Sequence, residues 1–362
     1  MKKILLLIPD LKLVGGVSNY YNSLDLVNYE NIDYFFVNSY KKENFLQKTI
    51  RLILNYIKFT IKISTDNYKV VHINPSLDGN SFYRDSIFIL ISKLFKINTI
   101  VFFRGWDDNF EIKIRKSKLK KFLFKISYAK ADFYIVLSKI FKSKLIQLGV
   151  LKTAPFKIET TVADSSLIQD FNIQDKLNSS NKSWQILFIS RIETNKGIYI
   201  AIDSFHLLKK HNKNIKLSLK IAGEGGEFIA AQKYVNDNKI CDVEFLGNVS
   251  GRKKHELLKE SKILLFPTFF GEGMPNCVLE AMLYGMPIVS RINAGIPDVV
   301  NHEENGFLTE SKDPSVFEGF LSLILNNPSL YERICISNHL KASNEFTSEK
   351  VRSRIINIYS EF

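Results

Sequence analysis

Cysteine is scarce in this sequence, and its placement limits the chemistry that the chain can support. The 362 residues include three cysteines, Cys241, Cys277 and Cys335, and no two of them form a Cys-x-x-Cys pair. This spacing argues against a disulfide framework and against a zinc site, and it favours a reducing compartment. We therefore expect a cytoplasmic protein with no structural metal.

Long apolar runs are also missing. The longest candidate, residues 86–103, is interrupted by Lys93 and Lys96, so a transmembrane span is not expected. At the beginning of the chain, the apolar run from Ile4 to Ile8 is only five residues long and ends in Pro-Asp. That pattern favours a buried first β-strand over a signal peptide.

Acidic residues are under-represented in the first half of the chain only. Residues 1–170 contain 27 Lys and Arg against 15 Asp and Glu, whereas residues 171–362 contain 23 against 22. The net charge of +13 therefore belongs almost entirely to the first half. Such an asymmetry predicts an anionic partner for that half, which would be a membrane surface, a nucleic acid or a charged substrate.

Two segments of the first half, 48–62 and 111–130, interleave Lys and Arg with Ile, Leu and Phe. A basic amphipathic helix can lie on an anionic bilayer surface, which would make the protein peripheral on the inner face of the membrane. A domain helix with one core face and one solvated basic face fits the same pattern. The sequence leaves both interpretations open.

Apolar runs alternate with amphipathic stretches along the first half, which predicts parallel βαβ units in a doubly wound sheet. The predicted strands span 3–8, 33–37, 69–73, 98–103 and 132–136. The predicted helices span 17–28, 45–63, 82–95, 115–129 and 138–148.

The polar segment 172–182 is rich in Ser and Asn and is interpreted as a linker, after which the alternation restarts. The second-half strands are predicted at 185–190, 216–222, 242–246, 263–266 and 287–290. The second-half helices are predicted at 197–211, 226–238, 253–260, 276–284 and 314–325. The expected architecture is α/β, with two Rossmann-like halves and a cleft between them.

The most informative segment follows the predicted strand 263–266. It reads Phe-Pro-Thr-Phe-Phe-Gly-Glu-Gly-Met-Pro-Asn-Cys-Val-Leu-Glu and places Glu272 and Glu280 eight positions apart. The Gly-Met-Pro turn puts one carboxylate on a loop and the other inside a helix, so both can reach one extended ligand at different points. A helix N-terminus reached through a glycine turn also offers free N–H groups to an anion or to sugar hydroxyls.

A basic motif, Arg-Ile-Glu-Thr-Asn-Lys-Gly, begins at Arg191 directly after the first strand of the second half. Arg191 and Lys196 would stand at the C-terminal edge of a doubly wound sheet, where ligands bind. Arginine as a planar fork and lysine as a point charge can each neutralise a diphosphate. Taken alone, the motif also fits a solvated basic loop.

Together these segments resemble the retaining glycosyltransferase family 4, with its E-x7-E motif and its GT-B fold of two Rossmann-like domains facing across a cleft. The resemblance is close over most of the second half and loose over the first. It implies that Arg191 and Lys196 contact a donor diphosphate. It also implies that Glu272 faces the donor sugar and that Glu280 binds the ribose hydroxyls.

The same resemblance implies the domain limits and the substrates. Residues 1–168 would form an acceptor-binding Rossmann-like domain and residues 169–345 a donor-binding one, with a C-terminal helix in 346–362 packing back on the first. The donor would be a nucleotide-sugar, UDP- or GDP-linked, and the acceptor a glycan or a lipid-linked glycan of cell-surface polysaccharide synthesis. Neither a metal nor another cofactor is expected, and nucleic acid is not an expected partner.

Several glycines also enter the expected site by resemblance. Gly15 and Gly16 match a Gly-Gly loop facing the cleft, where only glycine lets the backbone approach a ligand closely, although a plain βα turn would also explain them. Gly223 and Gly225, together with Val249, match positions beside the nucleotide, although tight-turn chemistry alone would explain the glycines.

Backbone amides at the start of the 276–284 helix are expected to meet the sugar or the phosphate. The segment concerned is Gly273, Met274, Pro275, Asn276 and Cys277, in which Pro275 contributes no N–H. The Cys277 thiol itself is expected to be buried rather than reactive.

The first half departs from the family where many members have a histidine that contacts the donor sugar. Arg104 stands there and is a candidate catalytic residue, with His72 as an alternative cleft residue or as a satisfied strand-end histidine. The Asp107-Asp108 pair is similar to a metal-binding Asp-x-Asp but lacks its context, and Asp107 would instead be available to orient an acceptor hydroxyl.

Two other classes of protein remain open. A nucleotide-sugar epimerase also uses two Rossmann-like halves, but it would need acid and base groups that Arg104 does not supply. A nucleic-acid-binding protein would explain the charge of +13, but it should concentrate that charge on one groove with aromatic stacking platforms. The two glutamates of the expected cleft argue against it.

Overall fold

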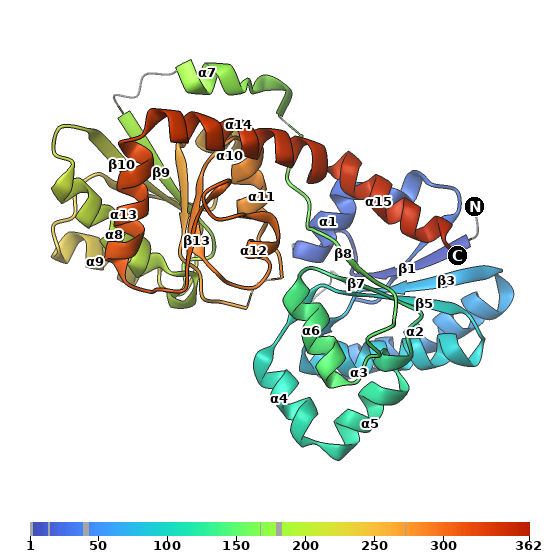
Figure 1. The fold of residues 1–362 in the computed structure, drawn as a ribbon. Helices are drawn as coiled ribbons and strands as arrows, with labels where there is room; N and C mark the ends of the chain where they lie inside the picture. Colours follow the sequence, from blue (N-terminus) through green and yellow to red (C-terminus); the bar gives the residue numbers. More distant parts are fainter. Residues whose placement is uncertain (1–2, 14, 39–42, 167, 179–182, 272) are drawn as a thin grey trace. The chain divides into compact units, whose positions relative to one another are not determined.

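The chain folds into two units, each built around one parallel β-sheet (Figure 1). The computed structural model describes residues 3–362 except 14, 39–42, 167, 179–182 and 272. The first unit comprises Met1–Thr161, Gly271–Met274 and Ser348–Phe362, and the second comprises Val162–Phe270 and Pro275–Thr347. The chain thus leaves the first unit after Thr161, seven residues before the expected limit.

The first unit has a six-stranded parallel sheet in the order β2-β1-β3-β5-β7-β8. Its strands are β1 (Lys3–Ile8), β2 (Ile32–Phe36), β3 (Tyr68–Ile73), β5 (Asn98–Phe103), β7 (Phe133–Val136) and β8 (Phe156–Ile158). Its helices are α1 (Gly16–Leu24), α2 (Phe45–Thr65), α3 (Gly79–Leu94), α4 (Asp108–Lys116), α5 (Lys118–Ile126), α6 (Lys139–Leu148) and α15 (Ser348–Ser360). Short strands β4 (Ser76–Leu77) and β6 (Gly105–Trp106) pair beside the main sheet.

The burial of the central strands of this sheet explains why their sequences predict strands. Residues Ile4 to Ile8 of β1 are at most 1% exposed, and Ile4 pairs with Ile32 of β2 on one side and with Val70 of β3 on the other. A parallel strand covered on both faces has no solvent side, so its sequence is continuously apolar. The predicted first strand is therefore confirmed.

The second unit has a six-stranded parallel sheet in the order β11-β10-β9-β12-β13-β14. Its strands are β9 (Ser183–Ile189), β10 (Lys216–Ala222), β11 (Val243–Gly247), β12 (Ile263–Phe266), β13 (Ile288–Arg291) and β14 (Gly306–Thr309). Its helices are α7 (Ile173–Asn178), α8 (Ile198–His211), α9 (Phe228–Asp237), α10 (Gly251–Glu260), α11 (Asn276–Leu283), α12 (Ile296–Val299), α13 (Pro314–Leu325) and α14 (Pro328–Glu345).

Each sheet has one point at which the strand order reverses. In the first unit the reversal falls between β1 and β3, and in the second it falls between β9 and β12. Ligands of open α/β sheets bind outside the carboxyl ends of the strands at such a switch point. The topology therefore selects two loop clusters, one in each unit, as places where a ligand would bind.

Two predictions about local structure are wrong. The segment interpreted as a linker contains helix α7, because Lys176 is buried and donates a 2.7 Å hydrogen bond to the carbonyl of Tyr284. The helix predicted at 115–129 is broken at Ser117, whose extended backbone ends α4 and whose side chain accepts the N–H of Lys120 to begin α5. The basic segment 111–130 is therefore not one continuous helix.

No helix among the described residues combines the length and the apolar character that crossing a membrane requires. The longest helix of the first unit is α2, which spans 21 residues and carries four Lys or Arg.

Candidate active site

The loops that follow β9 and β12 are tied together at the switch point of the second unit. The Phe269 N–H donates a 2.9 Å hydrogen bond to the carbonyl of Asn195. Gly197 has φ of 83°, and a Cβ there would lie 2.3 Å from the carbonyl oxygen of Pro267. Only glycine satisfies both the backbone angle and the close approach. The Arg191–Lys196 loop is thus held directly against the segment that leads into Phe270.

Phe270 brings the two predicted diphosphate contacts together. The Nζ of Lys196 lies 4.0 Å from the centre of the Phe270 ring, and the guanidinium carbon of Arg191 lies 5.7 Å from it. An aromatic ring attracts a cation over its face and holds it without neutralising its charge. The sequence did not single out Phe270, because an aromatic residue after a buried strand has the same pattern as a core residue.

The two cations differ in their surroundings. Arg191 is exposed and forms a 3.0 Å ion pair with Glu193, whereas Lys196 is buried. Burial, and then the nearby charge of Arg191, lowers the pKa of Lys196 to about 8. A buried ammonium interacts with an anion more strongly than an exposed one does, because less water screens it.

Gly223 and Gly225 have a packing role that the sequence could not show. A Cβ at Gly223 would lie 1.8 Å from the carbonyl oxygen of Ser190, and one at Gly225 would lie 2.4 Å from that of Ile192. These glycines let the loop after β10 press against the backbone on both sides of Arg191. Their position beside a nucleotide remains a prediction. Val249, two residues beyond β11, is buried.

Helix α11 begins at Asn276 without a side-chain cap, with Pro275 at its N-cap position. The N–H groups of a first helical turn have no intrahelical acceptors, so they are available to an anion or a hydroxyl. Burial raises the pKa of the Cys277 thiol to about 12, although Lys196 opposes part of the shift. The thiol is therefore protonated near neutral pH, and the expectation that it is not reactive fits this environment.

Glu280, one turn into α11, is buried against Lys254 of α10. The Nζ of Lys254 lies 2.9 Å from a Glu280 oxygen and 3.1 Å from an oxygen of Asp164. Burial raises the pKa of Glu280 although Lys254 opposes the shift. Burial alone would lower the pKa of Lys254, but the two carboxylates together raise it. Lys254 was not a predicted site residue, because nothing in the sequence distinguishes it from the neighbouring lysine.

The remaining residues of the glycine turn are divided between the two units. Glu272 lies outside the described residues, so its predicted role has no structural counterpart here. Gly273 and Met274 belong to the first unit, where a Cβ on Gly273 would lie 2.6 Å from the Leu137 side chain. The Met274 carbonyl accepts a 3.3 Å hydrogen bond from the hydroxyl of Thr161. Pro275, Asn276 and Cys277 belong to the second unit.

Arg104 of the first unit is held between two aromatic rings. Its guanidinium carbon lies 3.8 Å from the centre of the Tyr20 ring and 4.3 Å from that of Phe102. Among the described residues, its Nε and Nη1 have no hydrogen-bond partner. The two rings thus orient the Arg104 guanidinium by stacking. In the described part of the chain, no carboxylate hydrogen-bonds its Nε or Nη1.

His72 lies inside the core of the first unit. Its side chain is fully buried, and its Nδ1 lies 2.6 Å from the hydroxyl of Tyr359 in α15. Burial, and then the charge of Arg104, lowers the pKa of His72 to about 3, so the ring is neutral. Its Nδ1 is thus satisfied inside its own unit, whereas its Nε2 is buried and has no hydrogen-bond partner among the described residues.

Asp107 and Asp108 serve the beginning of helix α4. The Asp107 carboxylate accepts the N–H groups of Asn109 and Phe110, and Asp108 forms an ion pair with Lys144. Across the described part of the chain, no group of three or more His, Cys, Asp or Glu could hold a metal ion. Both carboxylates of the Asp-Asp pair are thus engaged in local contacts of the first unit.

Gly15 and Gly16 are not required by packing among the described residues. Gly15 has an extended backbone with φ of 175°, which any residue adopts, and no atom lies within 4 Å of a Cβ built on either glycine. The space beside this loop is open in the described structure. The predicted approach of a ligand to these two glycines stays a prediction.

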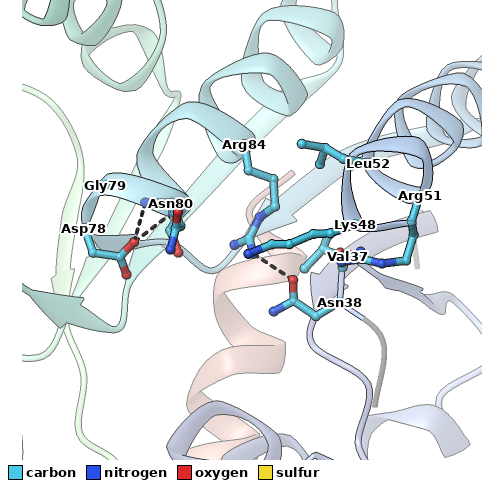
Figure 2. A pocket seen from close by; sticks show the side chains of 10 residues that line it. Val37, Asn38, Lys48, Arg51, Leu52, Asp78, Gly79, Asn80 and Arg84 are labelled. Atoms are coloured by element: carbon cyan, nitrogen blue, oxygen red, sulfur yellow. Dashed lines mark hydrogen bonds between the residues drawn. The ribbon is translucent and has the colours of Figure 1, made fainter. Parts of the chain in front are cut away.

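A cavity of about 490 Å³ lies in the first unit, between α2 and the beginning of α3 (Figure 2). Arg84 of α3 and Lys48 of α2 extend into it, and Arg84 donates a 3.1 Å hydrogen bond to Asn38, just beyond β2. Asp78, which caps the N-terminus of α3, lies at the edge of this cavity. None of these residues was among the predicted site residues.

A second cavity of about 120 Å³ adjoins the first and shares Asn38 and Arg84 with it. It extends to Leu7 and Pro9 at the end of β1 and to Asn74 after β3. The two cavities together therefore occupy the switch point of the first unit, where the sheet topology places a ligand.

Part of the chain matches a family model, and the chain is similar in sequence to curated glycosyltransferases. Residues 169–338 match the family model described as "Glycosyl transferases group 1". The chain is 23% identical over 225 residues to the amylovoran biosynthesis glycosyltransferase AmsK of Erwinia amylovora, covering 60% of this chain and 54% of that protein. It is 25% identical over 182 residues to the capsular polysaccharide biosynthesis glycosyltransferase CapM of Staphylococcus aureus, covering 50% and 47%. The chain thus spans about half the length of these curated relatives.

The solved structures show the fold. The crystal structure of Anabaena Alr3699/HepE in complex with UDP and glucose superposes with a TM-score of 0.72 at 15% identity, covering 100% of both chains. Sucrose-phosphate synthase from Thermosynechococcus elongatus gives a TM-score of 0.71 at 16% identity. The predicted α/β fold of the GT-B type is confirmed.

Proposed function

We propose that this protein is a glycosyltransferase that moves a sugar from a UDP- or GDP-sugar to a glycan or lipid-linked glycan during cell-surface polysaccharide synthesis. The observation that carries the proposal is the position of Lys196 and Arg191 around Phe270 at a sheet switch point, beside the uncapped start of α11. The family match over 169–338 and the polysaccharide glycosyltransferases among the relatives support it.

The donor is bound by the second unit in this proposal. Negative charge grows on the departing diphosphate as the bond to the sugar breaks, and Lys196 and Arg191 stabilise that charge. A buried, pre-oriented cation is effective because it needs no reorganisation when the charge develops. The HepE structure contains UDP and glucose, which makes a nucleotide-sugar the first donor class to test.

We further assign the protein to the retaining family 4 with the E-x7-E motif, so that the sugar keeps its anomeric configuration. In this scheme Glu272 faces the donor sugar, and Glu280 accepts hydrogen bonds from the ribose hydroxyls. Lys254 favours the charged form of Glu280, which is the better acceptor of those hydrogen bonds. No protein nucleophile is needed, because the departing phosphate can take the proton of the acceptor hydroxyl.

The acceptor is assigned to the first unit. The groups around its two cavities include amides, hydroxyls and charged groups, among them Asn38, Asn80, Ser81 and Arg84. Such groups suit a polyhydroxylated ligand, because each can donate or accept hydrogen bonds to sugar hydroxyls. Arg104 and the open Gly15–Gly16 loop belong to the same unit and are proposed to contact substrate.

Turnover of a panel of nucleotide-sugars tests this function. The protein should consume one UDP- or GDP-sugar when a glycan acceptor extract is present, and NMR should show the product with the anomeric configuration of the donor. An inverted anomer would overturn the family 4 assignment. Conversion of the nucleotide-sugar to its epimer without transfer would instead support the epimerase alternative, and tight nucleic-acid binding without turnover would remove the enzyme proposal.

Activity is expected to survive excess EDTA. The reason is that Lys196, Arg191 and the N–H groups of α11 supply the charge stabilisation that a divalent cation supplies in metal-dependent transferases. Initial rates should be compared before and after chelation, with Mg²⁺ and Mn²⁺ added back. Loss of activity on chelation that either metal restores would contradict the proposal of a metal-independent enzyme.

A further inference from the structure

Helix α2 presents an apolar face to the solvent. The α2 apolar face consists of Leu46, Ile50, Ile53, Leu54, Ile57 and Ile61, which are between 46% and 66% exposed. Phe45 at the start of the helix is 86% exposed, whereas only Phe59 and Ile63 of this 21-residue helix are buried. Of the 22 large apolar residues that are exposed in the described part of the chain, seven lie on this one helix.

The exposed residues form a continuous face. At about 100° per residue, the six members fall within an arc of roughly 100°, on the side away from Phe59 and Ile63. A surface helix of a globular domain normally turns polar residues to that side. Single exposed apolar residues are ordinary, but a contiguous patch marks a surface that another body covers.

The charge on α2 indicates what covers it. The helix contains Lys48, Arg51, Lys58 and Lys62 but no Asp or Glu. With the same helical geometry, all four lie on one flank, within an arc of roughly 80° between the apolar face and the buried face. Arg51 and Lys62 form ion pairs with neighbouring carboxylates, whereas Lys48 and Lys58 have no ion-pair partner among the described residues.

We propose that α2 is a membrane-docking helix whose occupant is an anionic lipid surface. The apolar face would enter the boundary between headgroups and acyl chains, and Lys58 on the adjoining flank would contact a lipid phosphate, as in helices that lie in the membrane interface. The net charge of the first half has the sign that such a surface attracts.

A second copy of the chain is a poorer occupant for this face. An antiparallel two-fold contact would place each surface against an identical one with both basic flanks on the same side, so like charges of the two copies would be brought near one another. The basic segment 111–130 is also a poorer docking site. Ser117 divides it into two nine-residue helices, and their exposed apolar residues are limited to Ile112, Leu119 and Phe122.

Lys48, Arg51 and Leu52 of α2 line the 490 Å³ cavity shown in Figure 2. By the same helical geometry they lie on the side of α2 that is turned away from the apolar face, so docking would leave the cavity uncovered by lipid. The docking itself does not rest on the proposed function.

Co-sedimentation with vesicles tests the proposal, using the full chain and equal parts of phosphatidylcholine and phosphatidylglycerol. The wild type should bind these vesicles at low salt, bind pure phosphatidylcholine weakly, and be released at high salt because ions screen the attraction. Replacing Ile50, Leu54 and Ile57 together by Gln should lower the partition coefficient roughly tenfold or more. Replacing Lys58 by Gln should weaken binding to anionic vesicles only.

The matched control replaces Leu119 and Phe122 of α5 by Gln, which removes exposed apolar surface from another basic helix of the same unit. It should bind within twofold of the wild type, and thermal unfolding should show that all variants remain folded. Wild-type protein that ignores anionic vesicles would overturn the proposal. So would vesicle binding that is lost in the α5 control but kept in the α2 variant. A dimer in sedimentation equilibrium that the α2 variant dissociates, without vesicle binding, would assign the face to a second copy.

Discussion

Replacing Lys196 by Ala is expected to lower kcat/KM for the donor by an amount that corresponds to about 2–4 kcal/mol of transition-state stabilisation. This is the scale of losing one pre-oriented group that stabilises transition-state charge. The effect is large because Lys196 is buried. Water that enters the vacated space would stabilise the diphosphate less well than the ammonium does. Replacing Arg191 by Ala should have a smaller effect, because that side chain is exposed and already paired with Glu193. Steady-state kinetics with the identified donor measures both changes.

The pH profile supplies an independent readout of the same residue. Burial lowers the pKa of Lys196 to about 8, and only the protonated amine carries the charge that binds the diphosphate. The value of kcat/KM should therefore fall as the pH rises through about 8, since that ratio reports groups of the free enzyme. Lys196→Arg should remove this alkaline limb, because a guanidinium stays protonated. Near-wild-type kinetics in Lys196→Ala, with an unchanged limb, would end the assignment.

Replacing Glu280 by Ala is expected to destabilise the fold by about 3 kcal/mol, the lower end of the range for breaking a buried ion pair. Lys254 would lose its 2.9 Å partner but would keep Asp164 at 3.1 Å, which is why the lower end applies. The free energy of unfolding, from urea titration followed by circular dichroism, measures the change. The same variant should also lose donor affinity if Glu280 binds ribose hydroxyls.

A double variant separates the two roles of Glu280. Adding Lys254→Met to Glu280→Ala removes the buried ammonium that lost its nearer partner, and Asp164 is partly exposed and can be hydrated, so most of the lost stability should return. Donor affinity should not return, because no carboxylate is restored to meet the ribose. If the double variant recovered both stability and donor binding, Glu280 would be only a structural partner of Lys254.

The sequence was sufficient for much of the fold because the relevant signals are local. Strand β12 and residues 186–188 of β9 are buried on both faces, so they appear as uninterrupted apolar runs in the chain. The alternation of strands and helices then implies parallel sheets, and parallel sheets place the residues after each strand at one edge. That reasoning alone located Arg191 and Lys196 at the edge where ligands bind.

Breaks and short helices were less accessible to prediction. The basic segment containing Ser117 has a continuous helical pattern, yet a hydrogen bond from Lys120 to the Ser117 side chain begins a new helix there. Helix α7 forms in a polar segment because Lys176 reaches buried carbonyls that are 82 and 108 residues away in the chain. Neither contact leaves a periodic signal in its own segment.

The sequence by itself determined five strands of each sheet, the uneven charge and the positions of the cations and carboxylates along the chain, but it missed the edge strands β8 and β14. The tertiary structure alone decided which of them meet: Lys196 with Phe270, Glu280 with Lys254, and Arg104 with Tyr20. It also decided that the apolar side of α2 faces outward. The physical reason is that hydrophobic periodicity records whether a side is apolar, whereas burial and pairing depend on residues far away in the chain.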